Sequence, residues 1–358
     1  MTDMLAIWGM GSGLTPRWPE EEKPVREYVR KCVDHGVTRL IPGREAPLLV
    51  EIGHEHGLEV DTYRWVNSYG GNNPSIEWSV GLTNPPLWDP GHRIVMENHR
   101  PVFGITEYKL TTTPFAERNR KFWNVAHDGH SEPLPGEILS LSFGFPDVRR
   151  HEAEQLLEVY RKSKSDGLQM EFVLLNMDKN GVNDSGYEEP IVTAFQSKYQ
   201  KNPLKLPNND PEWMQFRSDY TTTFVRELRD ALKSESQDTR FTATVIARES
   251  PDYIKVFQDW PRWIEQNLLD EFFVWFRTTS DLKEVEKQTR QAAELVNKRI
   301  PLIVELSCFH PGSFQNPDTL LEAAKIARAN GADSVGVYRS HAVEQLNLWS
   351  TVEQIRKL

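Results

Sequence analysis

Short runs of apolar and β-branched residues alternate with longer amphipathic segments along the whole chain. Turn residues bound each short run, which is typical of buried strands. Eight such runs are predicted as strands: Leu5–Met10, Thr38–Pro42, Leu58–Arg64, Gly167–Leu174, Arg240–Ala247, Glu271–Phe276, Pro301–Ser307 and Ser334–Tyr338. Apolar residues recur with helical spacing between them, over Glu20–His35, Glu45–His56, Val148–Lys164, Glu212–Ser234, Tyr253–Asn267, Leu282–Lys298, Asp318–Asn330 and His341–Lys357.

Eight strands alternating with eight helices predict an α/β protein with a (β/α)8 TIM barrel. The main alternative is a doubly wound open sheet, but no Gly-x-Gly-x-x-Gly motif leads into a predicted helix. No stretch has the composition of a linker. We therefore expect residues 1–358 to form a single (β/α)8 barrel catalytic domain.

Two connections in this pattern are unusually long: Trp65–Asp147 after the third strand and Leu175–Pro211 after the fourth. Both follow strand ends, on the side of a barrel that carries active sites. Within the first, Ile138–Phe143 has the pattern of an extra short strand. The two connections also contain aromatic and histidine residues suited to lining a deep cleft: Trp65, Tyr69, Trp78, Trp88, Trp123, His127, His130 and Tyr187.

Three carboxylates lie at or just beyond the ends of different predicted strands: Glu171, Glu249 and Glu305. A pair of carboxylates on either side of a bond is what glycoside hydrolysis requires, one as acid and the other as nucleophile or base. Glu171 is the strongest catalytic candidate because both long connections flank its buried strand. For Glu249 the alternative is a helix cap before Ser250, and for Glu305 a salt-bridged residue of the barrel wall.

Arginines form the second group at the strand ends: Arg44, Arg64, Arg248, Arg277 and Arg339. An arginine fork binds carboxylate or sulfate in a bidentate manner, so these residues favour an anionic sugar polymer. The alternative is that they only neutralise the three glutamates. The substrate-binding residues expected in the same cleft are Trp8, Tyr63, Arg64, His127, Asp128, Asn176, Arg248, Arg277, His310 and Arg339.

Composition and short motifs argue against several classes of binding partner and cofactor. The net charge of −10 argues against a nucleic-acid or anionic-membrane surface, and no apolar run is long enough to span a bilayer. His127, Asp128 and His130 lack a third ligand with suitable spacing, so neither a metal nor another cofactor is predicted. The first residues lack the features of a signal peptide, which indicates either a cytoplasmic protein or an exported one whose signal has been removed. A monomer or homodimer is expected.

Several motifs resemble those of the family-10-like glycosyl hydrolases, with matching order and spacing over roughly residues 120–350. Asp166-Gly-Leu-Gln-Met-Glu-Phe172 is similar to that family's Asp-Gly-Ile-x-Leu-Asp-Phe/Tyr strand. The other matching segments are Phe145-Pro-Asp-Val-Arg149, Tyr187-Glu-Glu-Pro190 with Phe195, Tyr199 and Pro203, Asp210-Pro-Glu-Trp213 with Phe216-Arg217, and Gln258-Asp-Trp260-Pro-Arg-Trp263 with Leu269-Asp270.

The resemblance implies a (β/α)8 barrel that acts on glycosidic bonds, with a carboxylate of the fourth strand in its centre. The chain departs from the family pattern at that strand, where Glu171 replaces Asp and Val173 replaces an expected Arg. Glu305 also stands where a small residue is expected. One alternative is a metal-dependent sugar isomerase or epimerase, with Glu171, Glu249, Glu305 and His310 as ligands, against which the neighbouring arginines argue. Another is a non-catalytic carbohydrate-binding barrel, in keeping with Glu in place of Asp at 171.

Overall fold

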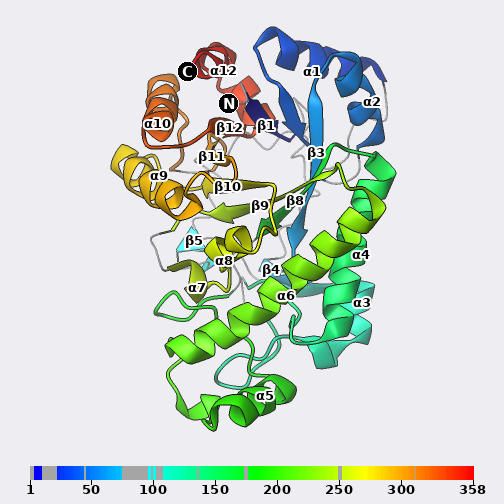
Figure 1. Cartoon of the computed structure of the whole chain (residues 1–358), viewed down its shortest axis with the longest axis vertical. Coiled ribbons are helices and arrows are strands. Elements are labelled where there is room, and N and C mark those ends of the chain that lie inside the picture. Colours follow the sequence, from blue (N-terminus) through cyan, green and yellow to red (C-terminus); the bar gives the residue numbers. More distant parts are fainter. Residues whose placement is uncertain are drawn as a thin grey trace.

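Eight parallel strands close into a barrel, with the strand order β1-β12-β11-β10-β9-β8-β3-β2 (Figure 1). This computed structural model describes residues 4–9, 22–43, 46–74, 96–97, 100–101, 108–134, 137–172, 176–248, 252–310 and 312–358. Each strand pairs in parallel with the neighbour that a TIM barrel requires. The predicted (β/α)8 fold is therefore confirmed.

The barrel strands are β1 (Leu5–Trp8), β2 (Arg39–Ile41), β3 (Glu59–Val66), β8 (Gly167–Phe172), β9 (Arg240–Ile246), β10 (Glu271–Phe276), β11 (Leu302–Ser307) and β12 (Ser334–Tyr338). The main helices of the chain between and after them are α1 (Glu22–Asp34), α2 (Pro47–Glu55), α4 (Pro146–Ser163), α6 (Pro211–Glu235), α8 (Trp260–Glu265), α9 (Leu282–Val296), α10 (Pro317–Ala329) and α12 (Trp349–Arg356).

Two predicted helices are each divided in the structure. The segment 253–267 contains α7 (Asp252–Lys255) and α8, and Phe257 between them has a φ of 59°. The segment 341–357 contains α11 (Ser340–Gln345) and α12, with Asn347 at a φ of 53°. A residue in the left-handed region ends a right-handed helix, which apolar periodicity does not reveal.

The two long connections carry small elements of their own: β4 (Gly70–Pro74), β5 (Met96–Glu97), β6 (Arg100–Pro101), β7 (Tyr108–Thr112), α3 (Pro114–Arg118) and α5 (Glu189–Tyr199), with 3-10 turns at Arg120–Phe122 and Pro203–Lys205. Strands β4 and β7 pair as an antiparallel ribbon. The extra strand expected at Ile138–Phe143 does not form, because Ile138 and Leu141 make only isolated bridges to Gly71 and Trp123. Helices α3 and α5 lie at the end of the molecule opposite the two termini (Figure 1).

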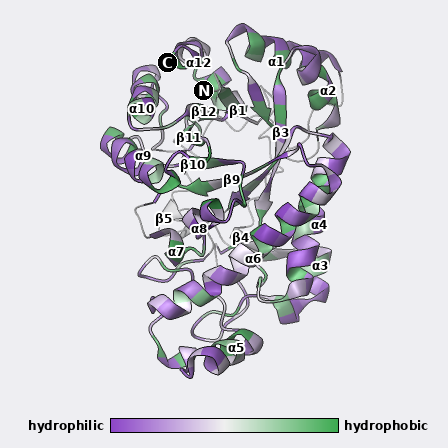
Figure 2. Cartoon of the chain, in the orientation of Figure 1, coloured by the Kyte–Doolittle hydropathy of each residue, from purple (hydrophilic) through white to green (hydrophobic). Residues whose placement is uncertain are grey.

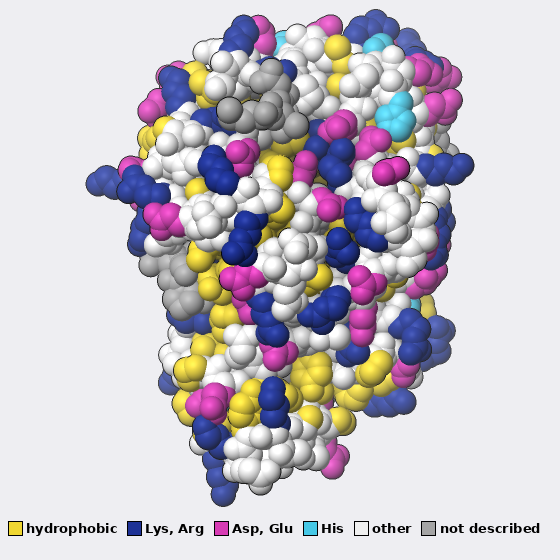
Figure 3. Space-filling model, in the orientation of Figure 1, with side chains coloured by type: hydrophobic (Ala, Val, Ile, Leu, Met, Phe, Trp, Pro, Cys, Tyr) yellow, Lys and Arg dark blue, Asp and Glu magenta, His cyan; other side chains and the backbone are white. Residues whose placement is uncertain are grey.

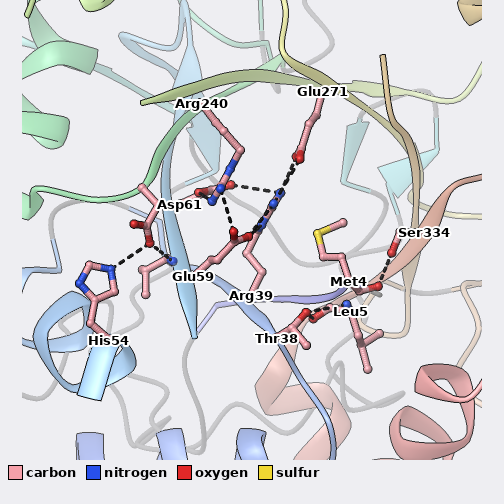
Figure 4. Close-up of polar contacts among 12 residues, drawn as sticks. Met4, Leu5, Thr38, Arg39, His54, Glu59, Asp61, Arg240, Glu271 and Ser334 are labelled. Atoms are coloured by element: carbon pink, nitrogen blue, oxygen red, sulfur yellow. Dashed lines mark hydrogen bonds and ion pairs between the residues drawn. The ribbon is translucent and has the colours of Figure 1, made fainter. Parts of the chain in front are cut away.

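Ionic groups fill the end of the barrel where the strands begin (Figure 4). Arg39 bonds to Glu59 and Glu271, and its Nη1 lies 3.4 Å from the buried Asp61. Arg240 donates to Asp61 Oδ1 over 2.7 Å and to Glu59 Oε1 over 3.0 Å. Every charge in this network therefore has an opposite charge beside it, as burial demands.

The middle of the barrel is packed around Trp8. Its indole is fully buried, donates to Gln169 Oε1 over 3.1 Å and meets Phe273 edge-on at 5.5 Å. Gly336 provides the space for this ring, because a Cβ at that position would overlap the six-membered ring of Trp8. The Trp8 side chain thus forms a floor beneath the end of the barrel where the strands finish.

The hydrophobic core fills the space between the barrel wall and the helices. Hydrophobic colour follows the strands and hydrophilic colour the outer faces of helices such as α4 and α6 (Figure 2). Charged side chains of both signs are interspersed over the face drawn in Figure 3. Within the part of the chain that the structure describes, no helix is both long enough and apolar enough to cross a membrane.

The close packing of Trp8 against Gly336 can be tested by adding a methyl group at residue 336. Gly336→Ala forces a methyl group into the ring and should lower the free energy of unfolding by about 1–3 kcal/mol, as overpacked cores do, in urea denaturation. In a Trp8→Phe background the same substitution should cost less, because the smaller ring leaves room. An equal cost in both backgrounds would contradict this account of the interior.

Candidate active site

Two glutamates lie at the end of the barrel where the strands finish, close enough for the charge of Glu171 to act on Glu305. Glu171 lies in β8, the fourth barrel strand along the chain, and Glu305 in β11, the seventh. Both are almost wholly buried, with 2% and 1% of their surfaces exposed. In each carboxyl group the Oε2 atom has no hydrogen-bond partner. Two of the three carboxylates predicted from the sequence are therefore together; Glu249, the third, lies outside the described residues.

Burial raises the pKa values of both carboxyls, and the nearby charge of Glu171 adds to the shift of Glu305. Burial lifts the pKa of Glu171 to about 7, although the Trp65 indole N–H and the cations of Arg277 and Arg339 oppose the shift. Burial, and then the charge of Glu171, raises the pKa of Glu305 well above its usual value, while the Thr244 hydroxyl opposes it. Such a pair titrates as a unit and retains one proton over a range of pH in which free carboxyls have lost theirs.

Each neighbouring arginine is held by a histidine. Arg277 Nε donates to His310 Nε2 over 3.3 Å, and Arg339 Nε donates to His341 Nδ1 over 2.7 Å. Burial and the adjacent guanidinium groups lower the pKa of His310 to about 3, and burial followed by Arg339 lowers that of His341 to about 3. Both rings are therefore neutral acceptors at ordinary pH. Neither arginine forms an ion pair with a carboxylate of the described residues.

Aromatic side chains surround the two carboxyls, and Tyr63, Trp65 and His310 are rings among them that were predicted. Tyr63 and Tyr338 are buried, and the charges of both glutamates contribute to raising the pKa values of their hydroxyls after burial itself. Tyr338 stacks on His310 with 5.5 Å between ring centroids. The sequence analysis missed Tyr338 and Trp275 as site residues; inward alternation along β10 and β12 is the signal that would have found them.

Other residues predicted to bind substrate lie elsewhere. Trp8 is buried in the barrel floor and offers no face to a ligand. Arg64 points to the helix layer, where it bonds to Glu152 of α4 over 2.8 Å, because alternate side chains of β3 face opposite sides. Arg248 Nη2 contacts Met177 Sδ at 3.5 Å. Arg44 lies outside the described residues.

A second group of predicted residues belongs to a cavity of about 260 Å3 between the two long connections. Asp128 and Asn176 line this cavity, together with the acidic residues Glu137 and Asp184. The Asn176 amide also holds the backbone of Ile138, with bonds of 3.1 and 3.0 Å. The backbone N–H of the neighbouring His127 donates to Asp184 Oδ1 over 2.9 Å. Asp128 and Asn176 thus line this separate cavity and do not belong to the site around Glu171 and Glu305.

The aromatic residues of the long connections mainly pack the connections themselves. Tyr69, Trp123 and Tyr187 are 1%, 2% and 5% exposed, so they do not line an open cleft. Trp78 and Trp88 lie outside the described residues. Trp65 differs, because half of its surface is exposed. Among the residues that the structure describes, no group of three or more His, Cys, Asp or Glu side chains is arranged to hold a metal ion.

Residues of the motifs that resemble a known family anchor these connections. Arg217 of α6 donates to the carbonyls of Ser185 and Asn208 over 2.8 and 2.7 Å. Glu188 is buried and accepts hydrogen bonds from Val125 N and Ser142 Oγ. Arg149 holds the Phe143 carbonyl over 2.7 Å. These three residues of the motifs thus build the walls around the end of β8, while the motif at residues 166–172 contains Glu171 itself.

Comparison with known families agrees with this architecture. The family model "Glycosyl hydrolase-like 10" matches residues 106–310, which is more than half of the chain. The chain belongs to the glycosyl hydrolase-like 10 family. The expectation of a glycosyl hydrolase-like enzyme is thereby confirmed, and the matched region includes Glu171, Arg277 and Glu305. No curated protein matches the sequence.

Solved structures share the fold of this member of the glycosyl hydrolase-like 10 family. A β-galactosidase from the psychrophilic Marinomonas ef1 has a TM-score of 0.62 at 12% identity; the match covers 98% of this chain but only 59% of that chain. The PgaB (BpsB) glycoside hydrolase domain from Bordetella bronchiseptica has a TM-score of 0.58 at 13% identity, with 98% of both chains covered. The β-amylase catalytic domain from Paenibacillus polymyxa has a TM-score of 0.56 at 9% identity, covering 95% and 92%. At these identities the likeness shows the fold.

The raised pKa of Glu171 predicts how stability depends on pH. The folded state binds the proton more tightly than the unfolded state, so this contribution to stability is complete below pH 4.5 and is lost as the pH rises through about 7. Glu171→Gln resembles the protonated carboxyl at all pH values. In urea denaturation the variant should match the wild type near pH 4 and exceed it by on the order of 3 kcal/mol near pH 8. The same difference at both pH values would contradict the assignment.

Proposed function

We propose that this protein hydrolyses glycosidic bonds with Glu171 and Glu305 as its catalytic pair. The observation that carries the proposal is that these carboxyls, from the fourth and seventh strands, are buried with an unpartnered oxygen each, and that Glu305 lies within the electrostatic field of Glu171. Neither forms an ion pair with any described residue, unlike the carboxylates at the opposite end of the barrel. Carboxyls that serve only structure are normally neutralised in this way.

The two carboxyls share one proton, so one of them is an acid while the other is ionised. The protonated carboxyl donates to the departing glycosidic oxygen, while the ionised one attacks the anomeric carbon or activates water. Because two buried like charges repel, the singly protonated pair is the working form. A separation of roughly 5–5.5 Å between the carboxyls in the substrate complex would give retention, and one of roughly 6.5–9.5 Å inversion.

An anionic sugar, sulfated or uronic, is the substrate class that we propose for this site. Arg277 and Arg339 stand beside the carboxyl pair, as their influence on the pKa of Glu171 indicates. Their Nε atoms are directed by neutral histidines. A neutral imidazole positions a guanidinium without cancelling its charge, so each terminal fork keeps its affinity for a carboxylate or sulfate.

Replacing either carboxyl should remove turnover. Glu171→Gln and Glu305→Gln should each lower kcat by about 10²–10⁴, the usual contribution of a positioned acid or base. Reducing ends released from a panel of sulfated, uronic and neutral polysaccharides measure this effect. Glu188→Gln is the matched control, because burial also raises the pKa of Glu188 to about 7 although it lies in a connection outside the pair. Wild-type activity in Glu171→Gln would overturn the assignment.

The arginines should determine the preference for charge. Arg277→Gln and Arg339→Gln should raise KM for a charged oligosaccharide about tenfold or more, since hydrogen bonds between charged groups contribute about 1.5–3 kcal/mol. KM for the uncharged counterpart should change little. Arg226→Gln provides the control, because Arg226 is on the surface of α6 and bonds to Gln266. Equal losses on both substrates would leave the arginines a purely structural role.

A further inference from the structure

Trp65 occupies a particular position at the open end of the barrel. It belongs to β3, where it is the register partner of Glu171 on the adjacent β8. Tyr63 and Asp61, two and four residues earlier, point into the barrel, so alternation along the strand directs Trp65 inward as well. Since β3 ends one residue later, at Val66, the indole lies at the rim of the barrel rather than inside it.

Exposure distinguishes Trp65 from the other tryptophans that the structure describes. Half of its surface is accessible, whereas Trp275 is 4% and Trp349 5% exposed. An indole left half in water forgoes a large gain from burial, which most tryptophans obtain in the core. No aromatic ring of the described residues stacks on it. A flat apolar face is therefore available immediately beside the carboxyl pair.

The polar edge of the same ring lies near Glu171, because the two residues are register partners on adjacent strands. The indole N–H favours the ionised form of the Glu171 carboxyl and so opposes the rise of its pKa. Indole has one donor and no acceptor, so this edge recognises the carboxylate rather than the carboxylic acid. The ring thus offers two different surfaces, an apolar face toward solvent and a donor toward Glu171.

We propose that Trp65 is the platform on which a sugar ring of the substrate stacks, and that its indole N–H orients the Glu171 carboxyl beside that ring. The face of an indole suits the C–H side of a pyranose, because both are flat and apolar. Trp65 is accordingly a positioning residue that links substrate binding to the charge state of Glu171. The inference deepens the proposed function and rests on it for the identity of the reaction.

Two substitutions separate the two roles. Trp65→Phe keeps a flat face and removes the N–H, so it should leave KM within about twofold and move the acidic limb of the kcat/KM profile to higher pH, because Glu171 loses a donor that favours ionisation. Trp65→Ala removes both surfaces and should weaken binding about tenfold, which corresponds to about 1.4 kcal/mol. Leu204→Ala is the matched control, since Leu204 is 51% exposed and lies in the remote Pro203–Lys205 turn.

Binding is measured apart from turnover, by calorimetry in the Glu305→Gln background with hexagalacturonate and uncharged cellohexaose as probes. Weaker binding in Trp65→Ala but not in Leu204→Ala supports the platform, even if the wild type hydrolyses neither probe and the proposed function fails. Unchanged binding in Trp65→Ala, or no binding of either probe, overturns the platform while hydrolysis of other glycans by the wild type still stands. A pH profile of Trp65→Phe identical to the wild type overturns the link to Glu171.

Discussion

The strongest constraint on this barrel is that charge placed inside it must be balanced. At the end where the strands begin, Arg39 and Arg240 contact Asp61, Glu59 and Glu271 directly, so each charge there has an opposite charge beside it. At the other end Glu171 and Glu305 have no such contacts among the described residues, and burial favours their protonated forms instead. Burial of a carboxyl without a cation costs several kcal/mol as the charged form, so protonation is the cheaper state. One end of the barrel therefore holds paired charges, and the other holds the two carboxyls that we propose as catalytic.

The two departures from the family pattern lie together in space. Glu171 replaces the expected Asp, and Glu305 replaces an expected small residue, on strands separated by β9 and β10 in the barrel. Burial raises the pKa of both carboxyls, and the charge of Glu171 adds to the shift of Glu305. Considered one at a time the departures weaken the resemblance. Considered together they form the carboxyl pair that the proposed reaction needs.

Residues that carry the resemblance have a supporting role. Arg217, Arg149 and Glu188 bind backbone groups of the two long connections. Long loops near an active site need such anchors because their own backbone polar groups must otherwise find water. Similar motifs can therefore accompany different chemistry: they specify the walls of the site, and the strand ends specify what happens between them.

Most of the barrel could be predicted from the sequence. Apolar runs of strand length alternate with segments of helical periodicity, and this local pattern is enough to locate strands and helices along the chain. All eight predicted strands are present. Helix divisions at Phe257 and Asn347 were missed, because a left-handed residue inside an amphipathic segment leaves the periodicity intact. Proximity to a strand end identified Glu171, Glu305, Arg277 and Arg339. Only the tertiary structure decided the direction in which each side chain points. Arg64 faces a helix, Trp8 is buried beneath the carboxyl pair, and Trp65 lies at the rim of the barrel. The reason is that barrel closure and strand register, rather than local sequence, determine which side of the barrel wall a side chain faces.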